Sequence, residues 1–238
     1  MMKEDVAVDL EMTGTQVKTD RILEIGACRV RNGEIVDTFH TMVDPRCEIP
    51  EYVQTLTGIK PEEVAGAPSQ EEAVRAFLDF AGDDVVLGHN VNFDYAFIKV
   101  AAVNMGRTFE NKALDTLKIA RLVLPPEQTK KLPALAKYYG FEHHAHRALA
   151  DATVTALLYE KLIAEYGEPK GHPEVFEPQT IVFKPKKSQP ATEGQKTRLL
   201  HLCEIYGEEL KVDINSLSRS EASRMSDALV AKYGRVKE

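Results

Sequence analysis

The stretch VAVDLEMTG, residues Val6 to Gly14, starts as a run of apolar and β-branched residues and ends in two acids and a glycine. The run predicts a buried strand over Val6 to Asp9. Alternate side chains of a strand point to one face, so we expect Asp9 and Glu11 to project together, roughly 7 Å apart. Two such carboxylates repel each other unless a cation lies between them, and hard oxygen ligands suit Mg²⁺ or Mn²⁺. The stretch predicts a metal site; the competing interpretation is a solvated strand end with two surface acids.

The chain that follows predicts strands first and then alternating strands and helices. A strand over Ile22 to Val30, a turn at Arg31 to Gly33 and a strand over Glu34 to Val43 form an antiparallel meander. The later pattern predicts a capped helix from Ser69 to Gly82, a buried strand in DVVLGH (84–89), a helix ending at Gly106, a helix around 113–122, a helix at 132–139 and a long helix at 147–166. This order predicts an α/β fold, a mixed sheet flanked by helices.

Proline spacing divides the chain into parts. Five prolines between residues 168 and 190 predict a linker, together with a basic KPKK cluster. Two amphipathic, capped helices follow and predict a small helical module. The expected organisation is a large domain at 1–167, a linker at 168–190 and a module at 191–238. Lys184, Lys186, Lys187, Lys196 and Arg198 suggest that the module binds nucleic acid or a protein partner; the alternative is a solvated helical pair.

Composition excludes several classes of protein. Hydrophobic residues at 43% and charged residues at 28% are typical of a globular chain and not of a disordered one. No apolar run is long enough to span a bilayer, and the N-terminus does not resemble a secretory signal, so we expect no membrane association and a cytoplasmic location. The formal charge of −7 argues against bulk attraction to a polyanion and favours a narrow site in which metal ions supply positive charge.

Three later residues are candidates to complete the metal site. Asp94, in GHNVNFDYAFI, falls in the first turn of a helix that directly follows a buried strand, at the sheet edge where ligands gather. His146 and Asp151, in HAHRALADA, would lie about 140° apart on an ideal helix, which predicts His146 in the preceding loop and Asp151 on the helix. The separation suits a base and a ligand. Asp94 and His146 each have a structural alternative, because Asp94 also suits the helix dipole and His146 has histidine neighbours. Asp115 is interpreted as a helix N-cap.

The chain contains five motifs in this order: VDLEMTG, LTGI, GHNVNFDYAFI, LDTLKIAR and HRALADA. Together they resemble the DEDD exonucleases of the histidine-containing branch, which includes the proofreading exonuclease of bacterial replicative polymerases. The likeness covers about residues 4–166. It implies a ribonuclease H-like fold and a metal-dependent 3′-to-5′ exonuclease that uses two Mg²⁺ or Mn²⁺ ions. It implies the metal ligands Asp9, Glu11, Asp94 and Asp151, and His146 as the base that deprotonates the attacking water.

The resemblance also implies substrate contacts and leaves the nucleic acid open. The terminal nucleotide would meet Met12, Thr13, Gly14, His89, Asn90 and Phe93, although Met12 and Phe93 equally suit core packing. Single-stranded DNA is the favoured substrate, with a polymerase or another DNA-processing protein as a partner. Methionine at position 12, as in oligoribonucleases, keeps trimming of short RNA as the alternative. A binding protein built on an inactive nuclease fold would normally have lost one of the five catalytic positions.

Overall fold

The computed structural model describes residues 4–167 and 173–234 and divides into two compact units. The first unit contains the described residues up to Pro45 and those from Pro50 to Pro185. Its elements are β1 (Glu4–Met12), β2 (Ile22–Arg31), β3 (Glu34–Met42), α1 (Glu51–Thr57), α2 (Pro61–Val64), α3 (Gln70–Ala81), β4 (Val85–Gly88), α4 (Asn92–Asn104), β5 (Ala113–Asp115), α5 (Thr116–Val123), α6 (Leu132–Tyr139), α7 (Ala148–Tyr166) and η1 (Pro173–Phe176). Residues 168–172 of the predicted linker and 235–238 of the predicted module lie outside the described residues.

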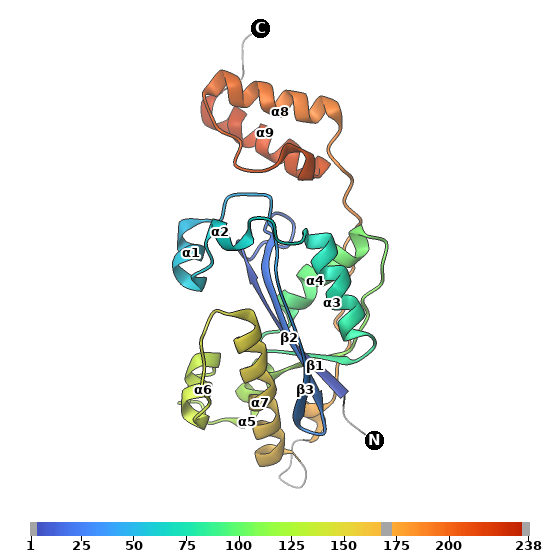
Figure 1. The fold of residues 1–238 in the computed structure, drawn as a ribbon, viewed down its shortest axis with the longest axis vertical. Helices are drawn as coiled ribbons and strands as arrows, with labels where there is room; N and C mark the ends of the chain where they lie inside the picture. The colour runs from blue at the N-terminus through green and yellow to red at the C-terminus, as the bar shows by residue number, and fades with distance from the viewer. Residues whose placement is uncertain (1–3, 168–172, 235–238) are drawn as a thin grey trace. The chain divides into compact units, whose positions relative to one another are not determined.

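The first unit is built on a five-stranded mixed sheet in the order β3-β2-β1-β4-β5 (Figure 1). β1 and β3 both run antiparallel to β2, whereas β4 runs parallel to β1 and β5 parallel to β4. Asn32 and Gly33 form the turn of the first hairpin with φ angles of 52° and 82°, the left-handed geometry that matches the twist of a two-residue hairpin. The predicted mixed sheet flanked by helices is therefore confirmed.

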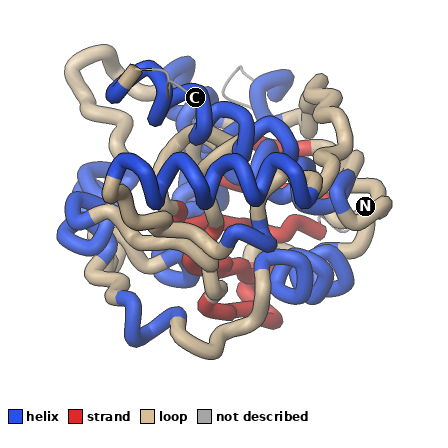
Figure 2. The backbone as a smooth tube through the Cα atoms, turned by 90° about the horizontal axis from the view of Figure 1, so that it is seen from above, coloured by secondary structure: helices blue, strands red, loops and turns tan. Residues whose placement is uncertain are grey.

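Helices cover both faces of this sheet (Figures 1 and 2). α3 and α4 pack on one face, and α5, α6 and α7 on the other, where they form two separate apolar clusters. Val6 and Val8 of β1 belong to the first cluster and Ala7 to the second, and all three side chains are fully buried. Burial of each valine stabilises the fold by about 1.5–3 kcal/mol. Because side chains alternate along the strand, Asp9 and Glu11 emerge on the face of Ala7, beneath α7.

Local signals in the sequence correctly predict several helix ends. Ser69 and Glu72 form the predicted capping box at α3, and Gly140 ends α6 with a φ of 74°. β1 continues to Met12, three residues beyond the strand predicted up to Asp9, because Glu11 pairs with Glu24 of β2 across the ladder. The predicted N-cap at Asp115 is present: its carboxylate accepts hydrogen bonds from the amides of Leu117 and Lys118.

The segment that begins at Pro173 joins the first unit. Phe176 of η1 is buried in the cluster beneath α7, with 6% exposure. Farther on, Gln179 exchanges two backbone hydrogen bonds of 2.8 Å with Ala113 of β5. This pairing covers part of the outer edge of β5, whose backbone groups would otherwise lie unpaired at the edge of the sheet.

The second unit consists of Arg46–Ile49 and the described residues from Lys186 onward, with α8 (Glu193–Tyr206), η2 (Ile214–Ser216) and α9 (Arg219–Tyr233). Leu199 of α8 and Ala222 of α9 meet in its small core. The backbone of Glu48 donates to Lys211, and that of Asp213 donates to Arg46, each at 2.9 Å. Within residues 4–167 and 173–234, none of the helices is both long enough and apolar enough to cross a membrane.

Candidate active site

Asp9 and Glu11 stand at the carboxyl end of β1 in an environment that opposes their ionisation. Loss of hydration, together with the charges of Asp151, Glu24 and Asp94, raises the pKa of Glu11 to about 8, and Arg147 opposes this rise with a smaller effect. Burial and the neighbouring Asp94, Asp151 and Glu11 raise the pKa of Asp9 well above 3.8. Carboxylates with such shifts are typical of functional sites.

Asp94 joins the site from the first turn of α4. It is 6% exposed, and its Oδ1 accepts a hydrogen bond of 2.9 Å from the backbone amide of Leu10 on β1. This bond ties α4 to the strand that carries Asp9 and Glu11. Burial raises the pKa of Asp94 to about 7, although hydrogen bonds from backbone amides lower it. Asp94 thus lies in the first turn of a helix that follows a buried strand, as its position in the sequence predicts.

Asp151 and His146 lie at the start of α7, in the arrangement that the spacing predicts. Asp151 is in the first turn of the helix and 7% exposed, and its Oδ2 accepts a 2.8 Å hydrogen bond from the backbone amide of His146. His146 precedes the helix with a φ of 64°, a left-handed geometry that costs energy for a residue with a side chain. Ligand atoms of Glu11, His146 and Asp151 all lie within 4.8 Å of one another.

The donor set fits divalent cations. The charge of Asp151 raises the pKa values of Asp9, Glu11 and Asp94, and the charge of Asp94 raises those of Asp9 and Glu11. Buried like charges of this kind are unfavourable unless a cation neutralises them. Four carboxylates offer the oxygen ligands that Mg²⁺ and Mn²⁺ prefer. The four acids and His146, drawn from β1, α4 and the start of α7, therefore share one site.

The predicted substrate residues at the end of β1 mostly contact other residues of the same chain. Met12 is half-buried and packs against the apolar cluster under α3 and α4. Thr13 is 6% exposed, its hydroxyl accepts from the amide of Arg21 at 2.9 Å, and its carbonyl accepts from Tyr52 Oη at 3.2 Å. A Cβ atom on Gly14 would lie 2.4 Å from Asp20 Oδ2. A side chain at position 14 would therefore displace the Asp20 carboxylate, which accepts a hydrogen bond from the Gln16 amide.

The second group of predicted substrate residues follows β4. Two of them form hydrogen bonds within the chain, and the third is exposed. Both ring nitrogens of His89 have partners, since Nδ1 lies 2.9 Å from Thr116 Oγ1 and Nε2 lies 2.8 Å from the Lys130 carbonyl. Burial lowers the pKa of His89. Asn90 has a φ of 75° and donates its amide to Asp115 at 2.9 Å. Phe93 is 43% exposed, so core packing does not account for it.

The sequence patterns did not indicate two residues that lie beside the candidate site. The His143 side chain, which is 6% exposed, places Nε2 against Asp151 Oδ1, although the histidine tract suggests a surface position. Glu24 of β2 is 1% exposed and pairs in register with Glu11. Only the alternation of β2 could have indicated Glu24, because it places residues 24, 26 and 28 on one face. No periodic signal distinguishes His143 from its neighbours.

Comparison with known proteins agrees with this geometry. Residues 6–159 match the family described as Exonuclease. The chain is 43% identical over 155 residues to the PolC-type DNA polymerase III of Clostridium perfringens, covering 64% of this chain and 11% of that protein. It is 41% identical over 162 residues to DNA polymerase III subunit epsilon of Aquifex aeolicus, covering 67% of this chain and 80% of that one.

A solved structure shows the same fold. E. coli Exonuclease I in complex with a dT13 oligonucleotide superposes with a TM-score of 0.61 at 21% identity, over 69% of this chain and 42% of that one. The ribonuclease H-like fold expected from the motifs is thereby confirmed. The chain spans only 11% and 12% of two PolC-type relatives, so the likeness concerns one domain of those large proteins. Because the family match extends over residues 6–159, the chain belongs to the Exonuclease family of nucleases.

Proposed function

We propose that this protein is a metal-dependent 3′-to-5′ exonuclease that releases nucleoside 5′-monophosphates from single-stranded DNA ends. The observation that carries the proposal is the grouping of Asp9, Glu11, Asp94 and Asp151 with His146, from distant parts of the chain. Relatives named as DNA polymerase III enzymes support DNA as the substrate, as does a similar fold bound to a dT13 oligonucleotide.

The proposed chemistry follows from the positions of these side chains. The four carboxylates would hold two divalent ions, which when bound supply charge for the phosphoryl oxygens and for the leaving 3′ oxygen. The His146 imidazole accepts the proton of the attacking water. The water oxygen bonds to the last phosphorus while the bond from phosphorus to the preceding 3′ oxygen breaks. That 3′ oxygen takes a proton from solvent, and the phosphate stays on the released nucleotide.

End-labelled oligonucleotides test this proposal. The full chain is incubated with Mn²⁺ or Mg²⁺ and single strands labelled at the 5′ end, and the products are resolved by length. We expect a ladder that shortens from the 3′ end, and a rate about 10²–10⁴-fold lower for His146→Ala, as expected for a lost general base. Asp9→Asn should be inactive at any metal concentration.

A matched control is available in the same loop. His144 is exposed, with 81% of its side chain accessible, so His144→Ala should retain the wild-type rate. Equal digestion by wild type and Asp9→Asn would show that the activity comes from a contaminant and would remove the proposal. Parallel RNA strands address the alternative, trimming of short RNA, which methionine at position 12 favours. Faster digestion of RNA than of DNA would replace the proposed substrate.

The proposal extends to the lysines near the second unit. Lys184, Lys186 and Lys187 are exposed and would add nonspecific contacts to the phosphate backbone. Replacing all three by alanine should weaken binding to single strands and reduce the slope of log affinity against log salt by about 0.7 for each lost contact. An unchanged slope would show that these lysines do not touch nucleic acid.

A polymerase or another DNA-processing protein is the proposed partner. The names of the relatives in Clostridium perfringens and Aquifex aeolicus, both DNA polymerase III enzymes, support this part. Co-elution with a bacterial replicative polymerase subunit on size-exclusion chromatography is the expected result. Separate elution at micromolar concentrations of both proteins would argue that the chain works alone.

A further inference from the structure

Glu24 is a buried acid that the proposed chemistry does not use. It lies on β2, directly opposite Glu11 of β1, and paired residues of an antiparallel ladder point to the same face. Only 1% of its surface is exposed. A carboxylate in such a place is unfavourable unless hydrogen-bond donors satisfy its oxygens. The partners of Glu24 therefore indicate why the chain places an acid there.

Most of these partners belong to the start of α7. The backbone amide of Ala148 donates to Oε2 at 3.3 Å, and Arg147 Nη2 and Nε donate to Oε1 at 3.3 and 3.4 Å. His40 of β3 lies on the other side, with Nε2 2.7 Å from Oε1. The first amides of a helix need acceptors, and the N-cap residue Arg147 makes no capping hydrogen bond with its side chain. Glu24 supplies an acceptor from a different strand.

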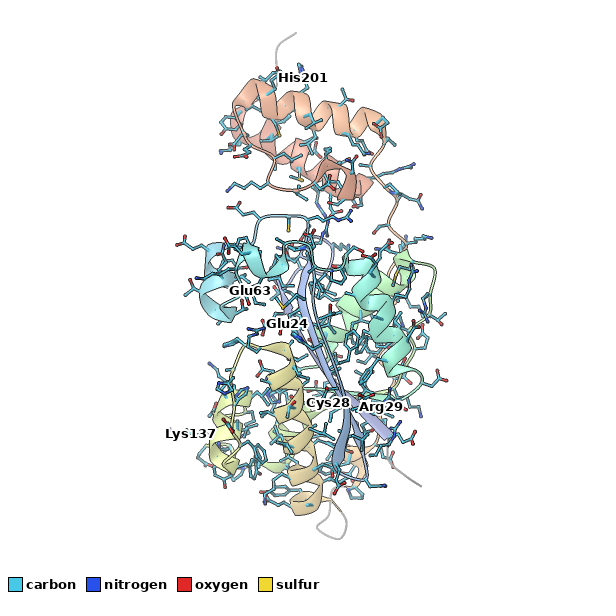
Figure 3. All side chains as sticks on the ribbon, in the orientation of Figure 1. Glu24, Cys28, Arg29, Glu63, Lys137 and His201 are labelled. Carbon is cyan, nitrogen blue, oxygen red and sulfur yellow. The ribbon has the colours of Figure 1, made fainter. Side chains whose placement is uncertain are left out.

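The next two residues on the same face of β2 also meet α7. A Cβ atom on Gly26 would lie only 2.0 Å from the backbone nitrogen of Leu149, so the helix reaches the strand because position 26 has no side chain. Cys28 Sγ donates to the Ala152 carbonyl at 3.7 Å. Figure 3 labels Glu24 and Cys28 along β2, beside α7. The three positions form a strip on which the first turn of α7 rests.

His146 lies between two anchors. Its amide is bonded to Asp151, and the next two residues are bonded to Glu24. The left-handed backbone at His146, with a φ of 64°, persists only where its surroundings hold it. We propose that Glu24 is a positioning residue that holds residues 147–148 so that the His146 imidazole faces Glu11 and Asp151. This inference rests on the proposed function, in which His146 is the base.

A double-mutant cycle tests whether Glu24 acts through His146. Single-turnover cleavage of a single-stranded DNA is measured with saturating Mn²⁺ for wild type, Glu24→Ala, His146→Ala and the double variant. We expect Glu24→Ala to slow cleavage about 10- to 100-fold in the wild-type background, with KM unchanged, and less than about twofold in the His146→Ala background. Equal slowing in both backgrounds would overturn the proposal, because Glu24 would then act through the metal ligands or the fold.

A conservative variant guards against misfolding. Glu24→Gln keeps an oxygen that can accept from the Ala148 amide, so it should recover most of the rate that Glu24→Ala loses. If Glu24→Ala does not fold, the same cycle is run with Glu24→Met, which has a side chain of similar length and no oxygen acceptor, and equal slowing in both backgrounds again overturns the proposal. Wild-type cleavage by His146→Ala would instead refute the proposed function. Loss of cleavage in His146→Ala together with a wild-type rate in both Glu24 variants would refute only the positioning role.

The matched control is Glu63, which also faces Arg147. Its exposed carboxylate lies 3.8 Å from Arg147 Nη1, and Figure 3 labels it near Glu24. Glu63→Gln removes a charge beside the same guanidinium without touching the Ala148 amide. Its cleavage rate should stay within about twofold of wild type. A loss as large as that of Glu24→Ala would show that the charge balance at Arg147 matters, and would overturn the role of the hydrogen bond to Ala148.

Discussion

The two helix starts at α7 and α9 are held in opposite ways. In α9 the acceptor is local: Ser218 accepts from the amide of Glu221 and the Glu221 carboxylate accepts from that of Ser218. In α7 the acceptor for Ala148 is Glu24, which lies 124 residues away in the sequence. A local cap stabilises its own helix wherever that helix lies, whereas a distant one also fixes the helix against a strand. We interpret the second arrangement as the one that a catalytic loop requires.

The largest effect is expected from a substitution that adds a side-chain atom where α7 contacts β2. Gly26→Ala would put a Cβ atom 2.0 Å from the Leu149 nitrogen and 2.2 Å from the Ala148 carbonyl carbon, both backbone atoms that cannot rotate away. We expect the free energy of unfolding to fall by about 3 kcal/mol and cleavage to drop with it, because α7 carries Asp151. Urea unfolding and the oligonucleotide assay measure the two effects.

The control for that variant lies in the other unit. A Cβ atom on Gly194, within α8, would meet no other atom within 4 Å, so Gly194→Ala should raise the stability of the module by about 0.5–1 kcal/mol. Cleavage of a short single strand should not change. A neutral Gly26→Ala would contradict the close approach of α7 to β2, and destabilisation by Gly194→Ala would contradict the open space beside position 194.

A smaller effect is expected from the acids beneath α7. Burial raises the pKa of Glu11 from 4.5 to about 8 and that of Asp94 from 3.8 to about 7. Below pH about 4 folded and unfolded chains both hold these protons; between that pH and about 8 only the folded chain does. The free energy of unfolding of the metal-free protein should therefore fall as pH rises across this window.

Urea titrations between pH 5 and 9, in EDTA and in saturating Mn²⁺, check this dependence. Bound metal requires deprotonated ligands, so Mn²⁺ should stabilise the protein more at pH 8 than at pH 5. Asp9→Asn removes one carboxylate of the cluster, so in EDTA the free energy of unfolding should fall less steeply as the pH rises. A metal-free stability that rises between pH 5 and 8 would mean that the acids are not crowded as the structure shows.

The smallest expected effect concerns the local cap. Ser218→Ala removes the side-chain oxygen that accepts from the Glu221 amide at 3.3 Å, and should lower the stability of the module by about 1 kcal/mol. Cleavage of short single strands should be unchanged, because α9 contributes none of the proposed catalytic residues. Thermal unfolding and the labelled-strand assay give the two readouts. A lost cleavage rate at full stability would contradict the division between the units.

Much of the fold was predictable because its signals are local. The hairpin turn at Asn32 and Gly33, the capping box at Ser69 and the glycine that ends α6 lie at their predicted positions. The grouping of the proposed catalytic acids was also expected, from their order along the chain. The end of β1 was underestimated, because pairing with β2 rather than residue preference carries the strand through Glu11. The burial of His143 had no sequence signal at all.

The sequence by itself determined most of the elements, the candidate catalytic residues and the resemblance to a nuclease family, because periodicity, capping and motif order are properties of neighbouring residues. Only the tertiary structure decided that Glu24 meets the start of α7, that Asp20 fills the space beside Gly14 and that Arg46–Ile49 belongs with the helical module. These contacts join residues far apart in the chain or on different elements. They depend on strand register, sheet twist and the close approach of backbones, which no local pattern encodes.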